Sequence, residues 1–476
     1  MALHLHRAER TDLLADGLGA LLANPLPDPF AEELVLVPAR GVERWLSQRL
    51  SHMLGCKPGD GDGVCAGVAF RSPASLISEI SAITGTVDDD PWSPEAMTWP
   101  LLEVIDRSLG EPWCGTLATH LGHFHAGEEA ELRRARRYSV AHRLAGLFAS
   151  YARQRPQLLI DWLDGNAQDL DEDLMWQPEL WRALAGRVQA DPPHVRHQKT
   201  VARLREGPSD LPVRLSLFGH TRLACTDIEL LDALATHHDL HLWLPHPSDD
   251  LWRALTGRRG PVPRTDDTSR RRVRHPLLQT LGRDLRELQS VLPAAPATDE
   301  CLGAATRRET LLGWLQSDIA ANAVRPENRL PAVGDRSVQV HACHGTARQI
   351  AVLREVLLGL LEDDPTLEPR DIVVMCPDIE SCAPLIVADF GLGELPGANH
   401  PAHRLRVRLA DRALTQTNPL LGVAAELLQI AGSRATATQV LNMAQAPPVR
   451  ARFKFHRRRS RRHHRLGARI RCPLEL

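Results

Sequence analysis

Lysine, the side chain with which P-loop enzymes hold nucleotide phosphates, is scarce in this sequence. A P-loop has the pattern GxxxxGK followed by Ser or Thr, because its backbone amides and a lysine ammonium hold the nucleotide phosphates. The chain contains three lysines, and none of them fits this pattern. Lys57 precedes a proline, Lys199 precedes Thr200 without a glycine at the required spacing, and Lys454 lies beside a basic tail. The sequence therefore excludes a Walker-type ATP site.

The same lysines test for DNA cleavage of the restriction-enzyme type. That chemistry places an Asp or Glu two residues before a lysine, so that both groups flank a metal-bound water. Here the residues at those positions are Gly55, His197 and Arg452. This nuclease signature is absent, while other nuclease chemistries stay open because Asp and Glu are plentiful without forming a clustered motif.

Histidines and cysteines are the remaining candidates for a metal site. A predicted strand would point His341 and Cys343 to one face and His344 to the other, which separates the ligands. A second group spans a predicted helix-to-strand junction and comprises His237, His238, His241 and His246. We predict that both groups are structural. The nine cysteines contain no CxxC pair, which favours reduced thiols over disulfides or structural zinc.

Two arginines follow a predicted buried strand, Leu34–Val37. In open α/β sheets, ligands bind outside the carboxyl ends of the strands. Arg40 lies in the turn after this strand, and Arg44 is one helical turn further along the same side. Two interpretations remain open: a phosphate or base contact, or two solvated arginines in an arginine-rich protein. The neighbouring Trp45 is on the apolar side of the predicted helix, and we predict a core anchor in preference to a base-stacking platform.

The elements around these residues alternate between strand and helix. Apolar runs followed by helical periodicity recur along the chain, and two glycines, Gly41 and Gly219, fit tight turns after strands. A late unit predicts an alternating strand before a helix and a second strand at Ile372–Met375. Such crossovers build parallel sheets. We therefore predict an α/β fold with two sheet-containing lobes, helical insertions and a flexible polar connector at about residues 248–274.

Composition limits the class of protein further. The 476 residues are 43% hydrophobic and 24% charged, which is typical of a globular chain of two or three domains. No apolar stretch approaches the roughly 20 residues of a membrane span, so we expect a soluble, cytoplasmic protein without a membrane partner. The formal net charge is −2, but residues 456–476 hold eight arginines and one acid. The remainder is acidic, so any DNA contact must come from local grooves.

Several segments together resemble one family. The stretches "LVLVPARGVERWLSQRLS", "LFASYARQRPQLLIDW" and "HGTARQIAVLREVLLGLLEDDPTLEPRDIVVMCPD" are similar to the RecC family, the gamma subunits of exodeoxyribonuclease V, the RecBCD helicase-nuclease. The resemblance runs from about Leu3 to Phe455. It implies superfamily 1 helicase-like lobes of the inactivated P-loop NTPase type, in which Arg7–Asp12 stand where the glycines and lysine would be. ATP and Mg²⁺ then belong to RecB-like and RecD-like motor subunits, and this chain holds no cofactor and no catalytic or metal residue.

The resemblance also implies a function in double-strand-break repair and homologous recombination. The subunit would bind double-stranded DNA ends and guide the 3′-ended single strand through a tunnel where a Chi sequence is recognised. The residues that match the tunnel are Pro38, Arg40, Arg44, Ser72, Leu147, Arg155 and Arg196. Neutral Gly146 and Ala149 stand where acids are expected. Arginine can still hold phosphates without reading bases.

The expected domains are a first helicase-like lobe with a helical insertion (1–250), a connector with helical segments (251–335), the start of a second lobe (336–455) and a basic tail (456–476). Family members are more than twice as long. We favour a frameshift as the origin of the tail over a purposeful basic arm. Repeated aspartate codons (GAC) become arginine codons (CGA) when the reading frame shifts by one base. The alternative function is an inert or partner-titrating fragment that binds the motor subunits without acting on DNA.

Overall fold

The computed structural model separates into two compact units, Met1–Val338 and Gln339–Leu476. It describes residues 1–28, 30–55, 63–82, 90–167, 170–260, 262, 265–293, 296–303, 306–391, 405, 407–409, 418–431 and 435–454. The basic tail, residues 456–476, lies outside the described residues, and the predicted domain boundaries stay predictions. No described helix combines the length and apolar character needed to cross a bilayer.

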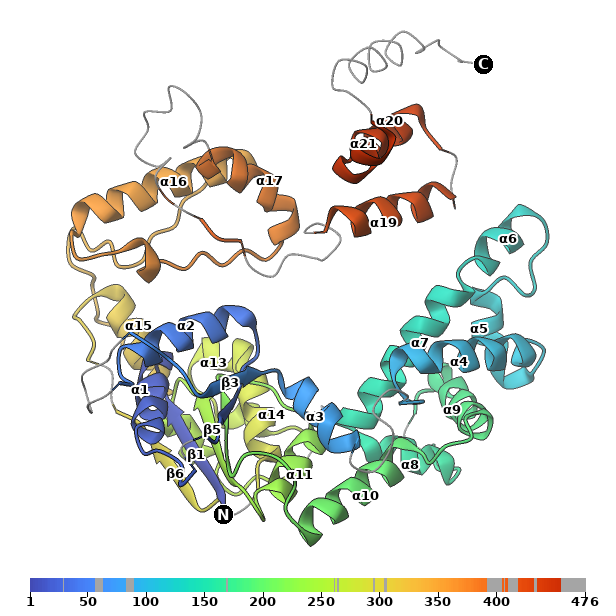
Figure 1. Ribbon diagram of the computed structural model, residues 1–476, viewed down its shortest axis with the longest axis horizontal. Coiled ribbons are helices and arrows are strands. Elements are labelled where there is room, and N and C mark those ends of the chain that lie inside the picture. The colour runs from blue at the N-terminus through green and yellow to red at the C-terminus, as the bar shows by residue number, and fades with distance from the viewer. Residues whose placement is uncertain are drawn as a thin grey trace. The chain divides into compact units, whose positions relative to one another are not determined.

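A six-stranded parallel sheet forms the centre of the first unit (Figure 1). Its order is β3-β2-β4-β5-β1-β6, and every pair of neighbours is parallel. The strands are β1 (Leu3–Ala8), β2 (Glu33–Leu36), β3 (Val68–Arg71), β4 (Arg214–Phe218), β5 (Asp239–Pro245) and β6 (Thr298–Cys301). The predicted α/β class with a parallel sheet is confirmed.

Helices cover both faces of this sheet, because successive residues of each strand point to opposite sides. On one face Val35 and Val37 pack with the helices α1 (Thr11–Leu22) and α2 (Arg40–Ser51). On the other face Leu34 and Leu36 pack with a second set of helices. That set comprises α3 (Pro73–Ala82), α10 (Pro193–Glu206), α11 (Cys225–Leu234) and α14 (Arg283–Val291).

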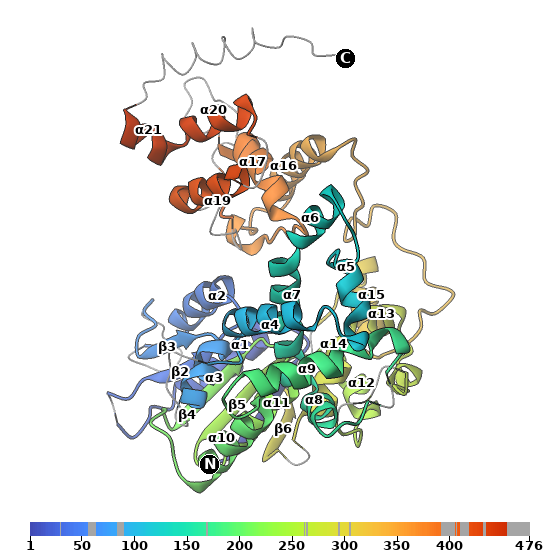
Figure 2. The ribbon, with the colours of Figure 1, turned by 90° about the vertical axis from the view of Figure 1, so that its right-hand side faces the viewer.

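The segment between β3 and β4 is the predicted helical insertion. Besides α3 and α10, which cover the sheet, its helices are α4 (Pro94–Ser108), α5 (Gly115–His120), α6 (Glu128–Arg134), α7 (Arg137–Gln154), α8 (Pro156–Leu163) and α9 (Trp176–Arg187). These helices enclose their own core around Phe148, Trp162 and Trp181. The insertion meets the sheet's helices through α10, which lies alongside α11 (Figure 2).

The predicted connector is more ordered than its composition suggested. The structure places α12 (Asp249–Ala254) at its start, where the Ser248 hydroxyl accepts a hydrogen bond from the amide of Leu251 (3.0 Å). This N-cap offsets the weak apolar periodicity. The helices α13 (Pro276–Leu281) and α15 (Leu311–Ala320) complete the first unit.

The second unit contains helices in its described residues but no strand. They are α16 (Thr346–Asp363), α17 (Ile379–Phe390), α19 (Pro419–Ala431), α20 (Ala437–Gln445) and α21 (Pro447–Phe453). The predicted strands here are wrong: Val340, Val373 and Met375 are 94%, 82% and 90% exposed in segments without strand pairing. A strand needs a neighbouring strand for its backbone hydrogen bonds, and the described part of this unit supplies none. The predicted second sheet is therefore not observed.

Candidate nucleic-acid interface

Four of the predicted contact residues meet at the carboxyl ends of β2 and β3. The amide of Val37 donates a hydrogen bond to the carbonyl of Arg71 (2.9 Å), so the chain leaves both strands side by side. Pro38 follows β2, and Ser72 follows β3. Arg40 is the first residue of α2 and Arg44 lies one turn further on. The sheet register thus brings Pro38, Arg40, Arg44 and Ser72 to one edge.

The two arginines at this edge are free to bind an anion. Arg40 and Arg44 are exposed, and neither forms an ion pair within the described chain. The N-cap residue of α2 is Ala39, whose side chain cannot accept a hydrogen bond. The amides of the first helical turn therefore have no side-chain cap. Guanidinium groups and helix N-terminal amides both favour phosphate oxygens.

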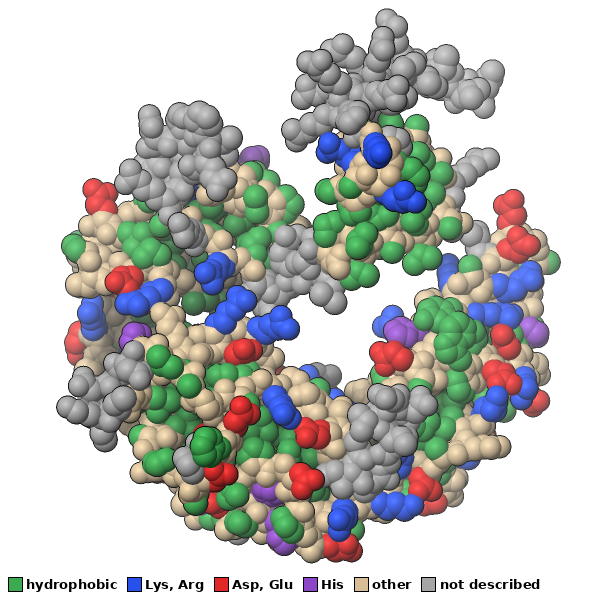
Figure 3. Space-filling model, viewed as in Figure 1, with side chains coloured by type: hydrophobic (Ala, Val, Ile, Leu, Met, Phe, Trp, Pro, Cys, Tyr) green, Lys and Arg blue, Asp and Glu red, His purple; other side chains and the backbone are tan. Residues whose placement is uncertain are grey.

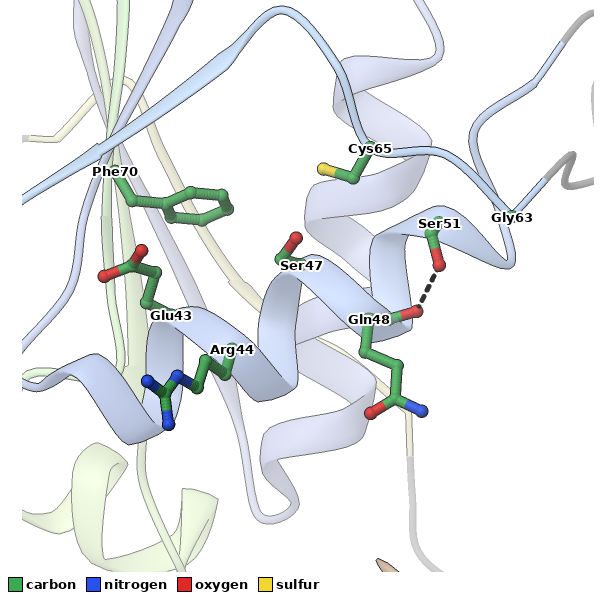
Figure 4. A pocket seen from close by; sticks show the side chains of 8 residues that line it. All are labelled: Glu43, Arg44, Ser47, Gln48, Ser51, Gly63, Cys65 and Phe70. Carbon is green, nitrogen blue, oxygen red and sulfur yellow. Dashed lines mark hydrogen bonds between the residues drawn. The ribbon is translucent and has the colours of Figure 1, made fainter. Parts of the chain in front are cut away.

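A groove of about 360 Å³ runs along α2 beside Arg44. Its lining comprises Glu43, Arg44, Ser47, Gln48, Ser51, Gly63, Cys65 and Phe70. Figure 4 shows Ser47, Cys65 and Phe70 facing one another across the groove, while Arg44 reaches outward from α2. Burial raises the pKa of the Cys65 thiol, so this cysteine stays protonated rather than acting as a nucleophile. Apart from the charged Glu43 and Arg44, the lining combines the polar Ser47, Gln48 and Ser51 with the apolar Phe70.

Ser72 has a structural role at the edge. Its hydroxyl oxygen accepts a hydrogen bond from the amide of Ser75 (3.2 Å), and its carbonyl accepts one from the Ser75 hydroxyl (2.8 Å). These bonds stabilise the start of α3.

The other predicted contact residues lie on the insertion. Leu147 is half-buried on α7 against the insertion core, and Arg155 is exposed at the break between α7 and α8. Arg196 on α10 forms an ion pair with Asp90, which neutralises it. The structure therefore leaves Arg155, but not Arg196, available for an external anion.

The end of α7 is fixed to the start of α11. Arg153 donates a hydrogen bond to the buried carboxylate of Asp227 (2.6 Å), and the hydroxyl of Thr226 donates to the carbonyl of Arg153 (3.0 Å). Helix α11 follows the loop that leaves the carboxyl end of β4, the neighbour of β2. This loop therefore connects the Arg40 edge with the Arg155 end of α7.

Ion pairs occupy the end of β1 and the start of the loop after it, where a P-loop would hold phosphates. The buried Arg7 donates to Asp249 (2.7 Å) and Asp299 (2.6 Å), and its guanidinium lies 4.4 Å from the centre of the Trp252 ring. The next charged residue, Glu9, pairs with Arg307. These side chains neutralise one another instead of facing a nucleotide.

Two sequence interpretations near this edge need correction. Trp45 is 38% exposed, with its ring 6.2 Å from that of Phe218, so it is only partly a core residue. Helical periodicity identifies the apolar side of a helix but not how much of each side chain other elements cover. Gly41 is inside α2 rather than in a turn, whereas Gly219 has a φ of +76° in the tight turn predicted after β4.

The clustered histidines have structural partners. His6 and His241 are joined by a ring-nitrogen hydrogen bond of 2.9 Å, and His238 bonds the carbonyl of Pro212 (2.9 Å). His341 and His344 belong to the exposed segment before α16, where the strand used in their prediction does not form. Within the described residues no three His, Cys, Asp or Glu side chains are placed to hold a metal ion.

Three buried histidines predict acid lability. Burial lowers the pKa of His220 and His246 to about 4, and burial together with His4 and His6 lowers that of His241 to about 3. Below pH 6.5 the unfolded chain binds protons that the folded chain does not, so stability is complete above that pH and falls towards pH 4. Each histidine contributes a slope of up to about 1.4 kcal/mol per pH unit.

Urea unfolding between pH 7.5 and 4.5 measures this slope. We expect His220→Gln to flatten it and the exposed His52→Gln to leave it unchanged. A free energy of unfolding that stays constant over this range would contradict the assignment.

Comparisons with known proteins agree with the residues quoted above. The model of the RecC N-terminal domain matches residues 3–322, and that of the RecBCD enzyme subunit RecC fourth domain matches 417–472. The chain is 76% identical to RecC of Mycobacterium tuberculosis H37Rv over 459 residues, and 70% identical to that of Mycolicibacterium smegmatis over 464. Identity to Escherichia coli K12 RecC is 28% over 506 residues.

These alignments cover 95–96% of the present chain but 41–43% of each relative. The chain thus spans about two fifths of the length of the curated relatives it matches. The second family match includes residues 456–472 of the basic tail, which lie outside the described residues.

Proposed function

Because the chain belongs to the RecC family, we propose that it is a non-catalytic DNA-binding scaffold subunit of a RecBCD-type helicase-nuclease, exodeoxyribonuclease V. In this role it acts in the cytoplasm in double-strand-break repair and homologous recombination. It receives double-stranded DNA ends and guides the 3′-ended single strand. RecB-like and RecD-like subunits supply the motors, with their ATP and Mg²⁺.

One contrast between arginines supports this proposal. Arg40 and Arg44 are exposed at the carboxyl edge of the sheet and have no ion pair within the described residues, whereas Arg7 is buried in ion pairs at the end of β1, where a nucleotide site would lie. The first pair can hold the phosphates of a DNA strand, and arginine does so without selecting a base. The proposed fold is accordingly a superfamily 1 helicase-like lobe that has lost its nucleotide site.

Recognition of a Chi-like sequence is the finer part of the proposal. Sequence is read by contacts to base edges, and the groove beside Arg44 offers hydroxyl and amide groups from Ser47 and Gln48 for such contacts. On α7, Gly146 leaves open space, since a Cβ there would meet no atom within 4 Å. The proposed path of the single DNA strand therefore has open space at Gly146 and polar side chains at α2.

Single-strand binding at several salt concentrations tests the DNA role. We expect the double variant Arg40→Ala/Arg44→Ala to bind a dT20 oligonucleotide about 10- to 100-fold more weakly than the natural chain. Two lost phosphate contacts should also lower the slope of log K against log salt by about 1.4. Fluorescence anisotropy of labelled dT20 measures both quantities.

A chain without residues 456–476 is the control for the basic tail. DNA binding that survives the two arginine substitutions but is lost when the tail is removed would assign the DNA contact to the tail. It would contradict the proposal that Arg40 and Arg44 bind DNA. Binding that depends on the arginines and not on the tail supports the proposal.

The second candidate function is to bind the motor subunits without acting on DNA. The exposed apolar side chains of Val340, Val373 and Met375 favour it, because such surface promotes association with other proteins. Co-purification with RecB-like and RecD-like subunits, in the absence of any single-strand binding, would select this candidate.

A further inference from the structure

Three neighbouring rings of the helical insertion are open to solvent. Trp99 on α4 is 64% exposed and Tyr138 on α7 is 51% exposed, and their ring centroids are 5.4 Å apart. The exposed His142 lies one turn along α7, with its ring parallel to that of Tyr138 at 6.1 Å. We call these three residues the α4–α7 platform. Figure 3 shows hydrophobic side chains at the surface over this part of the insertion. Adjacent exposed aromatic rings are typical of a binding surface.

Hydrogen bonds fix the histidine of the platform. The Thr98 hydroxyl donates to the carbonyl of Pro94 (2.6 Å), so its oxygen accepts from Nδ1–H of His142 (3.3 Å). This arrangement leaves Nε2 of His142 as a hydrogen-bond acceptor. The platform therefore combines flat ring faces with one hydrogen-bond acceptor.

Unpaired charge along α7 is positive. This helix contains no acidic residue, and Arg143 is exposed without an ion pair to any described carboxylate, as is Arg136 just before the helix. The neighbouring helices are mixed, since Glu128 and Glu131 accompany Arg134 on α6 and Glu95 lies on α4. The positive charge of α7 itself favours an anionic ligand.

The platform shares a face of α7 with the proposed strand path. Helical geometry aligns Tyr138, His142, Gly146, Ala149 and Arg153 along one stripe of about 22 Å. In the middle of the stripe a Cβ at Gly146 would meet nothing within 4 Å, and the half-buried Ala149 adds only a methyl group. The stripe ends where α7 meets α11, next to the exposed Arg155. A strand held near Arg155 can thus continue along α7 to the platform.

We propose that the α4–α7 platform stacks bases of the single DNA strand, while the nearby arginines hold its phosphates. Aromatic stacking beside a positive groove is the combination by which proteins bind single strands without regard to sequence. This inference rests on the proposed DNA-binding function and extends its path from the sheet edge to the insertion.

Binding of dT20 to the full chain and to platform variants tests the inference. We expect Trp99→Ala and Tyr138→Ala each to weaken binding about tenfold, with the salt slope unchanged because no phosphate contact is lost. Tyr138→Phe, which keeps the ring, should bind like the natural chain. Phe124→Ala removes a ring that is 66% exposed in the α5–α6 connection and is the matched control with no expected effect.

An abasic 20-mer separates stacking from phosphate contact. On this probe the natural chain and both alanine variants should bind equally. A tenfold loss on the abasic probe as well, or normal dT20 binding by both variants, would overturn the platform while leaving the Arg40 and Arg44 result intact. Normal dT20 binding with loss of co-purification with a RecB-like subunit would make the rings a protein contact and also overturn it. If the natural chain fails to bind dT20, the proposed function itself fails.

Discussion

Arg7→Met is expected to destabilise the first unit by about 3 kcal/mol at pH 7, although methionine fills a similar volume. The Arg7 side chain is 6% exposed and lies between the carboxylates of Asp249 and Asp299, which are 20% and 33% exposed. Removing one partner of a buried ion pair costs about 3–5 kcal/mol because it leaves uncompensated charge. Here that charge is on Asp299, since Asp249 keeps its pair with Arg253, and partial exposure of the carboxylates reduces the figure further. Urea unfolding monitored by tryptophan fluorescence measures the difference.

Two further variants show whether charge is responsible. The triple variant Arg7→Met/Asp249→Asn/Asp299→Asn removes both carboxylate charges that face Arg7 and should recover most of the loss. Arg10→Ala breaks an exposed pair with Asp12 and should cost less than about 1 kcal/mol. A triple variant no more stable than Arg7→Met would contradict the electrostatic explanation.

Trp181→Ala is expected to cost about 4 kcal/mol, the larger of the two effects. The Trp181 side chain is fully buried in the insertion, with its ring 5.3 Å from those of Trp92 and Phe148. Truncation of a buried tryptophan loses its transfer free energy and leaves a cavity. Because Phe148 belongs to α7, the loss should also loosen the helix that carries Leu147 and ends at Arg155.

The matched control is the same substitution on the surface of the insertion. Trp99 is 64% exposed, so Trp99→Ala should change the free energy of unfolding by no more than about 0.5 kcal/mol. Thermal unfolding followed by circular dichroism compares the two variants. Equal effects would contradict the described core. A stable Trp99→Ala chain also ensures that its DNA-binding result reports on the platform and not on folding.

The candidate interface was predictable where local pattern decides it. Leu34–Val37 followed by an arginine-bearing helix implied that Arg40 and Arg44 would lie at the carboxyl end of a strand, and parallel topology placed them there. The pairing of Arg196 with Asp90 was not predictable, because the two residues are distant in sequence. The exposure of Trp45 was missed for a similar reason: periodicity gives the apolar side of a helix but not how much of each side chain other elements cover.

The sequence by itself determined the class of fold, the absence of a P-loop lysine and the family to which the chain belongs. These properties depend on composition, spacing and local periodicity, which need no knowledge of distant contacts. Only the tertiary structure decided which charges are available. It buried Arg7 between Asp249 and Asp299, gave Arg40 and Arg44 no ion pair with any described carboxylate, and brought Trp99 next to Tyr138. Ion pairing and ring contact depend on distances between residues far apart in sequence, and folding alone sets those distances.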